Sequence, residues 1–270
     1  MSKVCVVTGG GSGIGFAGAK EMGKDHHIIL MGRTVSKLEG AIAKLKSLGY
    51  SAEAYPGDAS NPESVKQLAQ YAASKGDVDV LIHAAGVSPV QADYKKLIEI
   101  NAIGTITVDT EFAKVMPEGS VILNISSSSA YMLPENMLPI SKYALAITDG
   151  VDAFRQGIIE HLETLPEERR SPFGYPISKH FVKWYTEQLA IILGPKKIRV
   201  VSLAPGVIST DMSNGEASSA KMATASPAGR MGTTEEIGKF MNFMIRDGFI
   251  TGVDYLYDGG CIANMHAIKK

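Results

Sequence analysis

The sequence is poor in the features that mark secreted, metal-binding and nucleic-acid-binding proteins. It has two cysteines and one tryptophan in 270 residues, and its formal net charge is -1. Cys5 and Cys261 stand far apart and neither belongs to a CxxC pair, which argues against a disulfide scaffold or a thiolate metal site. Cys5 lies in an apolar run, so we interpret it as a small buried side chain. The balanced charge offers no electrostatic footprint for nucleic acid, and we expect no such partner.

Long apolar runs are also missing. No run approaches the ~20 apolar residues that a membrane-spanning helix needs. The chain passes from Lys3 straight into a strand-like segment, with no room before it for a signal peptide. With 45% hydrophobic and 20% charged residues, this length suits one large α/β domain or two small ones. We therefore expect a cytoplasmic protein without a membrane span.

Glycine is concentrated directly after the first predicted strand. Residues 4–7 are apolar, residues 8–15 read TGGGSGIG, and a helix-like segment follows from about Phe16 to Lys24. In such a strand–loop–helix unit, backbone N–H groups and the helix N-terminus face an anion such as pyrophosphate. A tight turn without a ligand is the alternative. The spacing TGxxxGxG differs from the GxGxxG of many dinucleotide-binding dehydrogenases.

The ends of the next two predicted strands carry candidates for nucleotide recognition. After residues 26–31 comes Arg33, where an acidic residue would hold the ribose 2′-hydroxyl of NAD. An arginine there pairs with a 2′-phosphate, so we expect a preference for NADP(H), with NAD(H) as the second choice; a solvent-exposed arginine is the alternative. A third strand, residues 51–55, precedes Asp58. Asp58 either accepts from the adenine amino group or caps the helix that begins near Pro62.

The fourth predicted strand, residues 78–82, leads into small residues that allow a close backbone approach to a ribose. His83, directly after it, is interpreted as a strand-end histidine rather than a base. A long helix is expected from about Gln91 to Met116, and it contains Asn101, whose amide needs a partner on an apolar face. A fifth strand, residues 120–125, then opens into four serines.

A second constellation lies at Tyr175-Pro176-Ile177-Ser178-Lys179. In a helix this spacing places the phenol and the ammonium on the same face. A free tyrosine has a pKa of about 10, and a cation beside it stabilises the phenolate, so proton transfer near neutrality comes within reach. Residues 71–75 repeat the pattern, and we interpret that copy as surface. Because proline is tolerated in a first helical turn, we expect this helix to begin close to Tyr175.

The order of these motifs resembles the short-chain dehydrogenase/reductase family over nearly the whole chain. The motifs that carry the resemblance are Thr8-Gly9-x-x-x-Gly13-x-Gly15, Ala84-Ala85-Gly86, Asn101, Asn124-Ile125-Ser126-Ser127, Tyr175-x-x-Ser178-Lys179, Pro205-Gly206-x-x-x-Thr210, Gly229-Arg230-Met231-Gly232, and Thr251-Gly252 with Asp258-Gly259-Gly260. The family usually has asparagine where this sequence has His83, so His83 departs from the family's pattern.

The resemblance implies four catalytic residues. Tyr175 would be the general acid/base that protonates the carbonyl oxygen during reduction. Lys179 would lower the pKa of Tyr175 and hydrogen-bond the nicotinamide ribose. Ser127 would orient the substrate oxygen, and Asn101 would hold the water that links Lys179 to a proton relay.

The resemblance also implies a cofactor site and no metal. The loop glycines would line the pyrophosphate, Asp58 the adenine, Ala85 and Gly86 the ribose, and Thr210 the carboxamide. The full set of cofactor-binding residues that we expect is Gly9, Ser12, Gly13, Ile14, Gly15, Arg33, Asp58, Ala59, Ala84, Ala85, Gly86, Tyr175, Lys179, Pro205, Gly206, Val207, Ile208 and Thr210.

The stretch between Ser127 and Tyr175 is longer than in most members of the family. The two residues are 175 − 127 = 48 positions apart, so we expect an insertion at about residues 130–170. Periodic apolar residues within it predict a helix from about Asp149 to Thr164. The insertion either alters subunit contacts or places residues 131–133 (Tyr-Met-Leu) as a wall of the substrate pocket. Some bacterial hydroxysteroid dehydrogenase/carbonyl reductases of the family carry an insertion at the same point.

The loop after Pro205-Gly206 resembles a substrate lid. It carries Val207, Ile208, Met212 and Met222, and flexible methionines suit a bulky hydrophobic substrate, although they are also common as core filler.

We therefore expect an α/β protein of the Rossmann type. Residues 1–270 would form a single NAD(P)-binding domain, a doubly wound parallel sheet that binds the nucleotide at the carboxyl ends of its strands. The expected enzyme is an NADP(H)-dependent oxidoreductase acting on CH–OH groups. It would transfer a hydride between nicotinamide and a bulky hydrophobic secondary alcohol or ketone such as a hydroxysteroid, as a homodimer or homotetramer.

Three alternatives are weighed against this expectation. The first is an NAD-dependent member of the family acting on a small alcohol or carbonyl. The second is a non-catalytic nucleotide sensor, against which the complete set of Ser127, Tyr175, Lys179 and Asn101 argues. The third is a sugar-nucleotide epimerase, whose substantial C-terminal substrate domain has little counterpart after Gly260.

Overall fold

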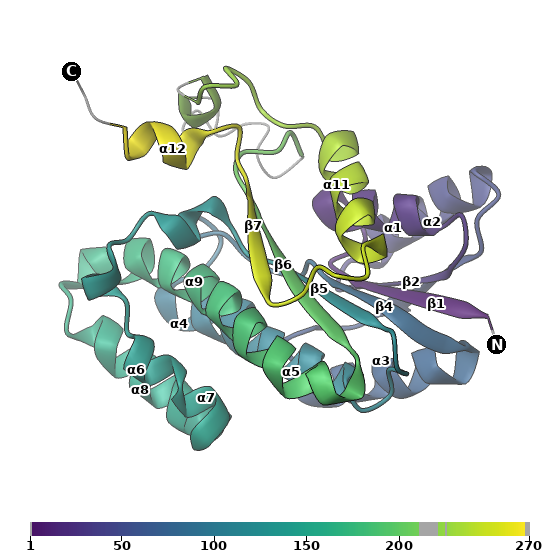
Figure 1. Ribbon diagram of the computed structural model, residues 1–270, viewed down its shortest axis with the longest axis horizontal. Helices are drawn as coiled ribbons and strands as arrows, with labels where there is room; N and C mark the ends of the chain where they lie inside the picture. The colour runs from purple at the N-terminus through teal and green to yellow at the C-terminus, as the bar shows by residue number, and fades with distance from the viewer. Residues whose placement is uncertain (1, 211–220, 225, 268–270) are drawn as a thin grey trace.

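The computed structural model describes residues 2–210, 221–224 and 226–267. Strands and helices alternate around one seven-stranded sheet of order β3-β2-β1-β4-β5-β6-β7, and each neighbouring pair is parallel (Figure 1). The strands are β1 (Lys3–Thr8), β2 (His27–Gly32), β3 (Ala52–Pro56), β4 (Asp77–His83), β5 (Val121–Ile125), β6 (Arg199–Pro205) and β7 (Val253–Tyr257). The strand order reverses between β1 and β4, which is where open sheets of this kind bind ligands. The predicted doubly wound α/β fold is confirmed.

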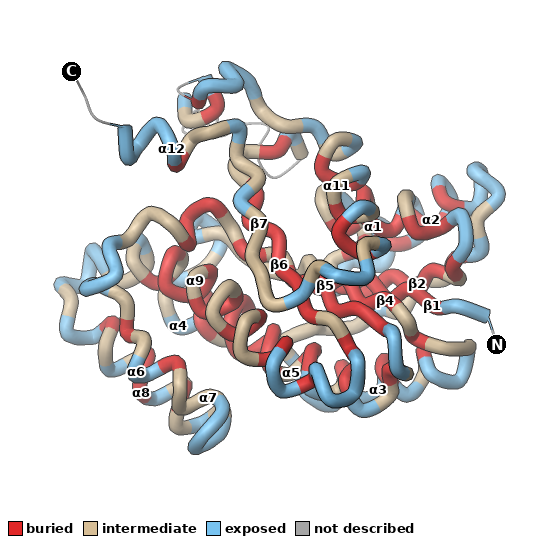
Figure 2. The backbone as a smooth tube through the Cα atoms, in the orientation of Figure 1, coloured by how far each residue is buried: buried red, intermediate tan, exposed pale blue. Residues whose placement is uncertain are grey.

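Helices cover both faces of the sheet. One layer consists of α1 (Gly13–Met22), α2 (Val35–Ser47) and α11 (Thr234–Arg246), and the other contains α3 (Pro62–Lys75), α5 (Gly104–Phe112) and α9 (Glu167–Leu193). In β1, Val4 and Val6 face the α9 layer whereas Cys5 and Val7 face the α1 layer. Strands buried on both sides read as continuous apolar runs. Figure 2 shows the central strands buried along most of their length, and the Cys5 side chain is buried as predicted.

The long helix expected from Gln91 to Met116 is divided into three parts. It consists of α4 (Tyr94–Leu97), a π-helical turn η1 (Ile98–Ile103) and α5, and it ends four residues early at Phe112. The apolar period does not reveal the π turn, because a single wide turn leaves the surrounding pattern almost unchanged. The turn holds Asn101 toward the loop after β4, where its side chain bonds the backbone of Val87.

Helices of the stretch 130–170 pack outside α9 (Figure 1, lower left). The chain forms η2 (Ser128–Tyr131), η3 (Glu135–Met137), α6 (Ile140–Tyr143), α7 (Leu145–Thr148) and α8 (Val151–Glu163). The helix predicted over 149–164 corresponds to α8 within two residues at each end. Phe154 of α8 lies with its ring centroid 4.3 Å from that of Phe181 in α9. The buried Tyr143 hydroxyl donates to the Ile177 carbonyl at 3.1 Å. These helices are therefore part of the hydrophobic core that includes α9.

The expectation that the Tyr175 helix begins close to Tyr175 is wrong. α9 begins at Glu167 and runs to Leu193, with Pro172 and Pro176 inside it. Each proline removes a helical N–H, which ordinarily stops a helix. Tertiary packing overrides this preference: Gly174 lies against Tyr94, and Pro176 is buried. Two further short helices are η4 (Gly194–Lys196) and α12 (Cys261–Met265).

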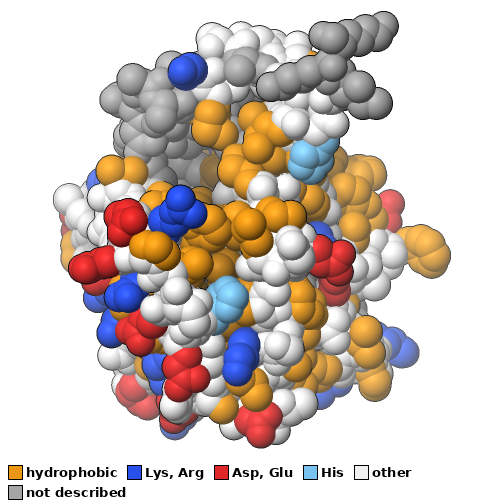
Figure 3. Space-filling model, turned by 90° about the vertical axis from the view of Figure 1, so that its left-hand side faces the viewer, with side chains coloured by type: hydrophobic (Ala, Val, Ile, Leu, Met, Phe, Trp, Pro, Cys, Tyr) orange, Lys and Arg blue, Asp and Glu red, His pale blue; other side chains and the backbone are white. Residues whose placement is uncertain are grey.

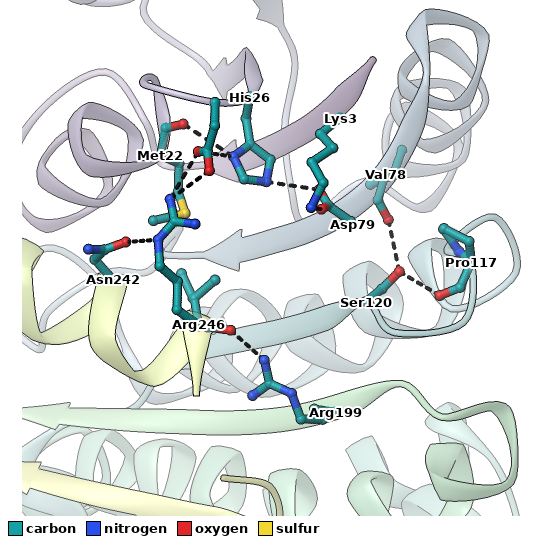
Figure 4. Close-up of polar contacts among 12 residues, drawn as sticks. Lys3, Met22, His26, Val78, Asp79, Pro117, Ser120, Arg199, Asn242 and Arg246 are labelled. Carbon is teal, nitrogen blue, oxygen red and sulfur yellow. Dashed lines mark hydrogen bonds and ion pairs between the residues drawn. The ribbon is translucent and has the colours of Figure 1, made fainter. Parts of the chain in front are cut away.

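A network of charged side chains joins the amino ends of the strands (Figure 4). The buried His26 has its Nδ1 2.8 Å from Asp25 Oδ1 and its Nε2 3.0 Å from Asp79 Oδ1. Lys3 pairs with Asp79 at 2.9 Å, and Arg246 of α11 pairs with Asp25 at 2.9 Å. The network therefore ties α11 to β1 and β4. None of the helices in the described part of the chain is long and apolar enough to cross a membrane.

Candidate active site

The glycine loop between β1 and α1 is folded tightly against the end of β4. Gly9 has a φ of +66°, and a Cβ built on it would lie 2.8 Å from the Ala84 carbonyl carbon. A Cβ on Gly15 would lie 2.5 Å from the Gly9 carbonyl oxygen. Only glycine fits these two positions, since any side chain would push the loop off β4. The structure thus brings the predicted residues Gly9, Gly15, Ala84 and Ala85 together at the switch point of the sheet.

The N-terminus of α1 fits the pyrophosphate of a dinucleotide. The helix begins at Gly13, and the side chain of its N-cap Ser12 makes no capping hydrogen bond. Gly13 has a φ of +55°, and a Cβ on it would lie 3.4 Å from Thr210 Cγ2. Ile14 is partly buried in the first turn. A helix N-terminus within a glycine loop is the setting in which backbone dipoles attract phosphate.

Arg33 and Asp58 follow neighbouring strands of the sheet. Arg33 is exposed after β2, and Asp58 lies beyond the end of β3. Burial alone would raise the pKa of Asp58, but hydrogen bonds from Ser60 and the charges of Arg33 and Lys96 outweigh it and hold that pKa below its ordinary value. The alternative that Asp58 caps α3 is wrong, because the Asn61 side chain accepts from Ser64 N at 3.0 Å instead.

Ala59 and Gly86 bring the two nucleotide-facing loops next to the helix of Asn101. A Cβ on Gly104 would lie 3.6 Å from the Ala59 carbonyl oxygen. A Cβ on Gly86 would lie 3.1 Å from Asn101 Oδ1 and 3.4 Å from Lys179 Nζ. Gly86 therefore leaves room for both side chains at the end of β4.

The Asn101 amide ties the loop after β4 to α9. Its Oδ1 accepts from Val87 N at 2.9 Å, and its Nδ2 donates to Val87 O at 3.0 Å and to Ser178 Oγ at 3.3 Å. The backbone carbonyl oxygen of Asn101 accepts from Thr105 Oγ1 at 2.8 Å. The side chain thus has the partners that its burial requires. Its role in holding a water stays a prediction.

Lys179 is a buried ammonium at the centre of the site. Only 6% of the residue is exposed, and its Nζ donates to the Ile125 carbonyl at 2.9 Å. Burial lowers the pKa of Lys179 to about 8, against the opposing charge of Asp254. Burial and the Lys179 charge together lower the pKa of His83 to about 3. His83 is therefore neutral, and its Nδ1 is hydrogen-bonded to Thr8 Oγ1 at 2.7 Å, which agrees with its interpretation as a strand-end histidine.

Ser127 follows the end of β5, and Tyr175 lies on α9, which packs against the turn that begins at Ser127. Ser127 is the N-cap of η2, and its Oγ accepts from Ser129 N at 3.2 Å. Tyr175 is partly exposed one turn before Lys179, and its carbonyl accepts from Ser178 Oγ at 2.7 Å. α9 packs against both η2 and η1, so the chain returns after the stretch 130–170 to the strand end that it left. The second tyrosine–lysine pair, on α3, contacts Glu53 and lies outside this site.

The loop after β6 borders a cavity of about 360 Å³. Pro205 ends β6, and a Cβ on Gly206 would lie 2.7 Å from Asp258 Cα, so glycine allows the loop to touch the C-terminal segment. The cavity is lined in part by Ser128, Val207, Ile208, Met222, Tyr257 and Cys261. Met212, which we expected in this loop, lies outside the described residues.

Sequence reasoning missed an acidic residue beside the serine turn. Asp254 of β7 accepts from Ser126 Oγ at 2.6 Å and from Tyr131 OH at 2.7 Å. Tyr131 thus turns its hydroxyl toward β7, and Leu133 packs against the core on the α9 side of the sheet. The available signal was a charged residue inside a short strand-like run, VDYLY.

Fold and site together define a Rossmann-type α/β protein with a glycine loop at the switch point of the sheet and a buried lysine nearby. A family model described as short chain dehydrogenase matches residues 3–144, and one described as enoyl-(acyl carrier protein) reductase matches residues 167–262. The chain belongs to the short-chain dehydrogenase/reductase family and is an NAD(P)-dependent oxidoreductase. The interval 145–166, which contains α8, falls between the two matches.

Relatives and solved structures span nearly the whole chain. A 3alpha-hydroxysteroid dehydrogenase of Mediterraneibacter gnavus is 29% identical over 276 residues, covering 96% of both chains. Carbonyl reductase family member 4 of Xenopus laevis is 27% identical, covering 96% of this chain and 98% of the relative. A short chain dehydrogenase of Burkholderia cenocepacia, solved in complex with NADP, has a TM-score of 0.76 at 22% identity, covering 97% of this chain and 98% of that one.

Proposed function

We propose that this protein transfers a hydride between NADP(H) and a secondary alcohol or ketone with a bulky hydrophobic body, such as a hydroxysteroid. One observation carries the proposal. The buried Lys179 ammonium lies at the end of β5 beside Asn101 and Gly86, one helical turn after Tyr175 and on the same strand end as Ser127.

The residues of the site divide the chemistry between them. Bound nicotinamide supplies or accepts the hydride. During reduction, Tyr175 donates a proton to the substrate oxygen, and the Lys179 ammonium stabilises the phenolate that this leaves. Ser127 donates a hydrogen bond that orients the same oxygen. Asn101 holds the loop and helix that set these distances, because its amide bonds both Val87 and Ser178.

Arg33 supports the choice of NADP(H). It is exposed at the end of β2, close enough to Asp58 for its charge to lower the pKa of that carboxyl, and it can pair with a ribose 2′-phosphate. The relative from Burkholderia cenocepacia was solved with NADP. The cofactor set that we propose is the one named from the sequence, from Gly9 to Thr210.

The hydrophobic substrate is supported by the surface around the site. The cavity beside Ser128 includes the apolar side chains of Val207, Ile208, Met222 and Leu256, together with the charged residues Arg230, Glu236 and Asp258. Figure 3 shows hydrophobic side chains gathered in a hollow on the face below α12. Two relatives are named for steroid and carbonyl chemistry. A homodimer or homotetramer in the cytoplasm is part of the proposal.

A substrate panel tests the proposal directly. Hydroxysteroids, their ketones and small carbonyl compounds are assayed with NADPH and NADH, for the wild type and for Arg33→Ala. We expect turnover of a hydroxysteroid or its ketone with NADPH, and a loss of roughly tenfold or more in kcat/KM for NADPH but not for NADH in Arg33→Ala, because a charge-assisted pair contributes about 1.5–3 kcal/mol. Equal rates with both cofactors would remove Arg33 as the selector, and turnover confined to small carbonyls would favour the alternative substrate class.

A further inference from the structure

Asp254 is a carboxylate placed in the layer beneath the catalytic residues. Parallel register puts Asn124, Ser202 and Asp254 side by side across β5, β6 and β7. Residues that pair in register point to the same face of a sheet, and the residues two positions earlier in β5 and β6, Ile122 and Val200, face α9. The Asp254 side chain therefore points toward α9, the helix of Tyr175 and Lys179.

Both carboxylate oxygens hold the turn that presents Ser127. Asp254 Oδ1 accepts from Ser126 Oγ at 2.6 Å, and Oδ2 accepts from Tyr131 OH at 2.7 Å. These donors flank Ser127 on both sides, one directly before it and one at the end of η2. A hydrogen bond to an ionised carboxylate is stronger than one between two neutral groups. The turn around Ser127 is therefore firmly anchored to β7.

The same carboxylate faces cations of α9. Its negative charge raises the pKa of Lys179, against the larger effect of burial. Lys183 lies with its Nζ 5.8 Å from the Tyr131 ring centroid and pairs with Glu187 at 3.1 Å. Lys183 is thus already neutralised by its own helix, and His83, which also faces Lys179, is neutral. Among these groups Asp254 is the negative charge that acts on Lys179.

We infer that Asp254 is a positioning residue of this site: it anchors the Ser126–Tyr131 turn around Ser127 and, facing α9, supplies a negative charge that favours the ammonium form of Lys179. The catalytic importance of this charge rests on the proposed function, but the electrostatic coupling does not. Without Asp254, Lys179 loses its proton at lower pH, and Tyr175 loses the cation that makes it an effective acid near neutrality.

Lysine NMR measures the coupling without any turnover. Nζ-labelled protein is titrated for the wild type, Asp254→Asn and Asp254→Glu, and the Lys179 signal is assigned by its loss in Lys179→Arg. We expect the Lys179 midpoint to fall by on the order of one pH unit in Asp254→Asn and to stay near the wild-type value in Asp254→Glu. Glu187→Gln is the matched control: it removes a carboxylate charge from the same face of α9, and it should move the midpoint by less than roughly 0.3 unit because its charge is paired and partly exposed.

An unmoved Lys179 midpoint in a folded Asp254→Asn protein would overturn the inference. Asp254→Ser, which keeps a hydroxyl partner for Tyr131, replaces Asp254→Asn if that variant does not fold. Activity gives a second readout: the alkaline limb of kcat/KM for carbonyl reduction should shift to lower pH in Asp254→Asn and return in Asp254→Glu. A wild type without oxidoreductase activity would refute the proposed function while the NMR result still decides the role of Asp254.

Discussion

At the scale of single residues, the site depends on one buried charge. Lys179 has a pKa of about 8 because burial disfavours its ammonium, and that value lies close to the pH at which Tyr175 would act as the acid in the proposed mechanism. The neighbours of Lys179 are arranged accordingly: a backbone carbonyl accepts from its Nζ, a neutral histidine lies near, and Asp254 supplies the opposing charge. The lysine is thus poised to respond to the phenol one turn away.

Replacement of Tyr175 by phenylalanine tests this arrangement. Tyr175→Phe removes the proton donor and leaves the ring, so we expect kcat to fall at least ~10²-fold while the affinity for NADPH changes little. Steady-state kinetics and fluorescence titration with NADPH measure the two effects. Tyr71→Phe, in the second tyrosine–lysine pair on α3, is the matched control and should retain full turnover. Near-normal turnover of Tyr175→Phe would sink the assignment.

At the scale of elements, α9 is supported by helices that the family models do not match. α8 buries Phe154, Ile158 and Leu162 in the core shared with α9, and the Tyr94 hydroxyl of α4 donates to Glu163 at 2.9 Å. This support explains how α9 continues through Pro172 and Pro176, which lie on either side of Tyr175. The stretch 130–170 therefore acts on the position of Tyr175 through packing.

Truncation of a single ring measures that support. Phe154 is fully buried with its ring 4.3 Å from Phe181, so Phe154→Ala leaves a cavity and should cost about 3–5 kcal/mol of unfolding free energy. Urea unfolding gives this value from the midpoint and slope. Ile147→Ala, at a side chain 43% exposed on α7, should stay within about 0.5 kcal/mol of wild type. A Phe154→Ala protein as stable as that control would show that α8 is a loosely attached appendage.

At the scale of the whole molecule, the two ends of the strands carry different groups of residues. The carboxyl ends carry the glycine loop, Ser127 and Lys179, while the amino ends carry the ion pairs around His26. His26 contacts two carboxylates, and α11 joins the network through Arg246. Burial alone would lower the pKa of His26, but Asp79 and Asp25 outweigh it and raise that pKa above its ordinary value.

This raised pKa predicts how stability varies with pH. A histidine whose pKa is higher in the folded than in the unfolded state stabilises the fold fully below the unfolded value of about 6.5. That contribution is lost as pH rises through the folded pKa. The difference in unfolding free energy between wild type and His26→Gln should therefore be largest near pH 6 and shrink toward alkaline pH, as followed by urea unfolding across this range. A difference that grows with pH would contradict the charged state assigned to His26.

The sequence by itself determined the fold class and predicted the residues of the candidate site. Alternating apolar runs and helical periods predicted the sheet and its helices, because strands buried on both faces must be apolar throughout. The geometry of short motifs such as TGGGSGIG and Tyr175–Lys179 is set locally, because a turn or a helix fixes the distances within each motif. These features need no knowledge of what lies far away in the chain.

Only the tertiary structure decided the contacts between distant segments. The start of α9 and the π turn at Asn101 depend on packing that outweighs local preference. Asp254 and Ser126 lie 128 residues apart, and the register of β5, β6 and β7 places them together. Hydrogen bonds and burial act through space. Spacing along the chain therefore does not reveal Asp254 as the charge that raises the pKa of Lys179 against the effect of burial.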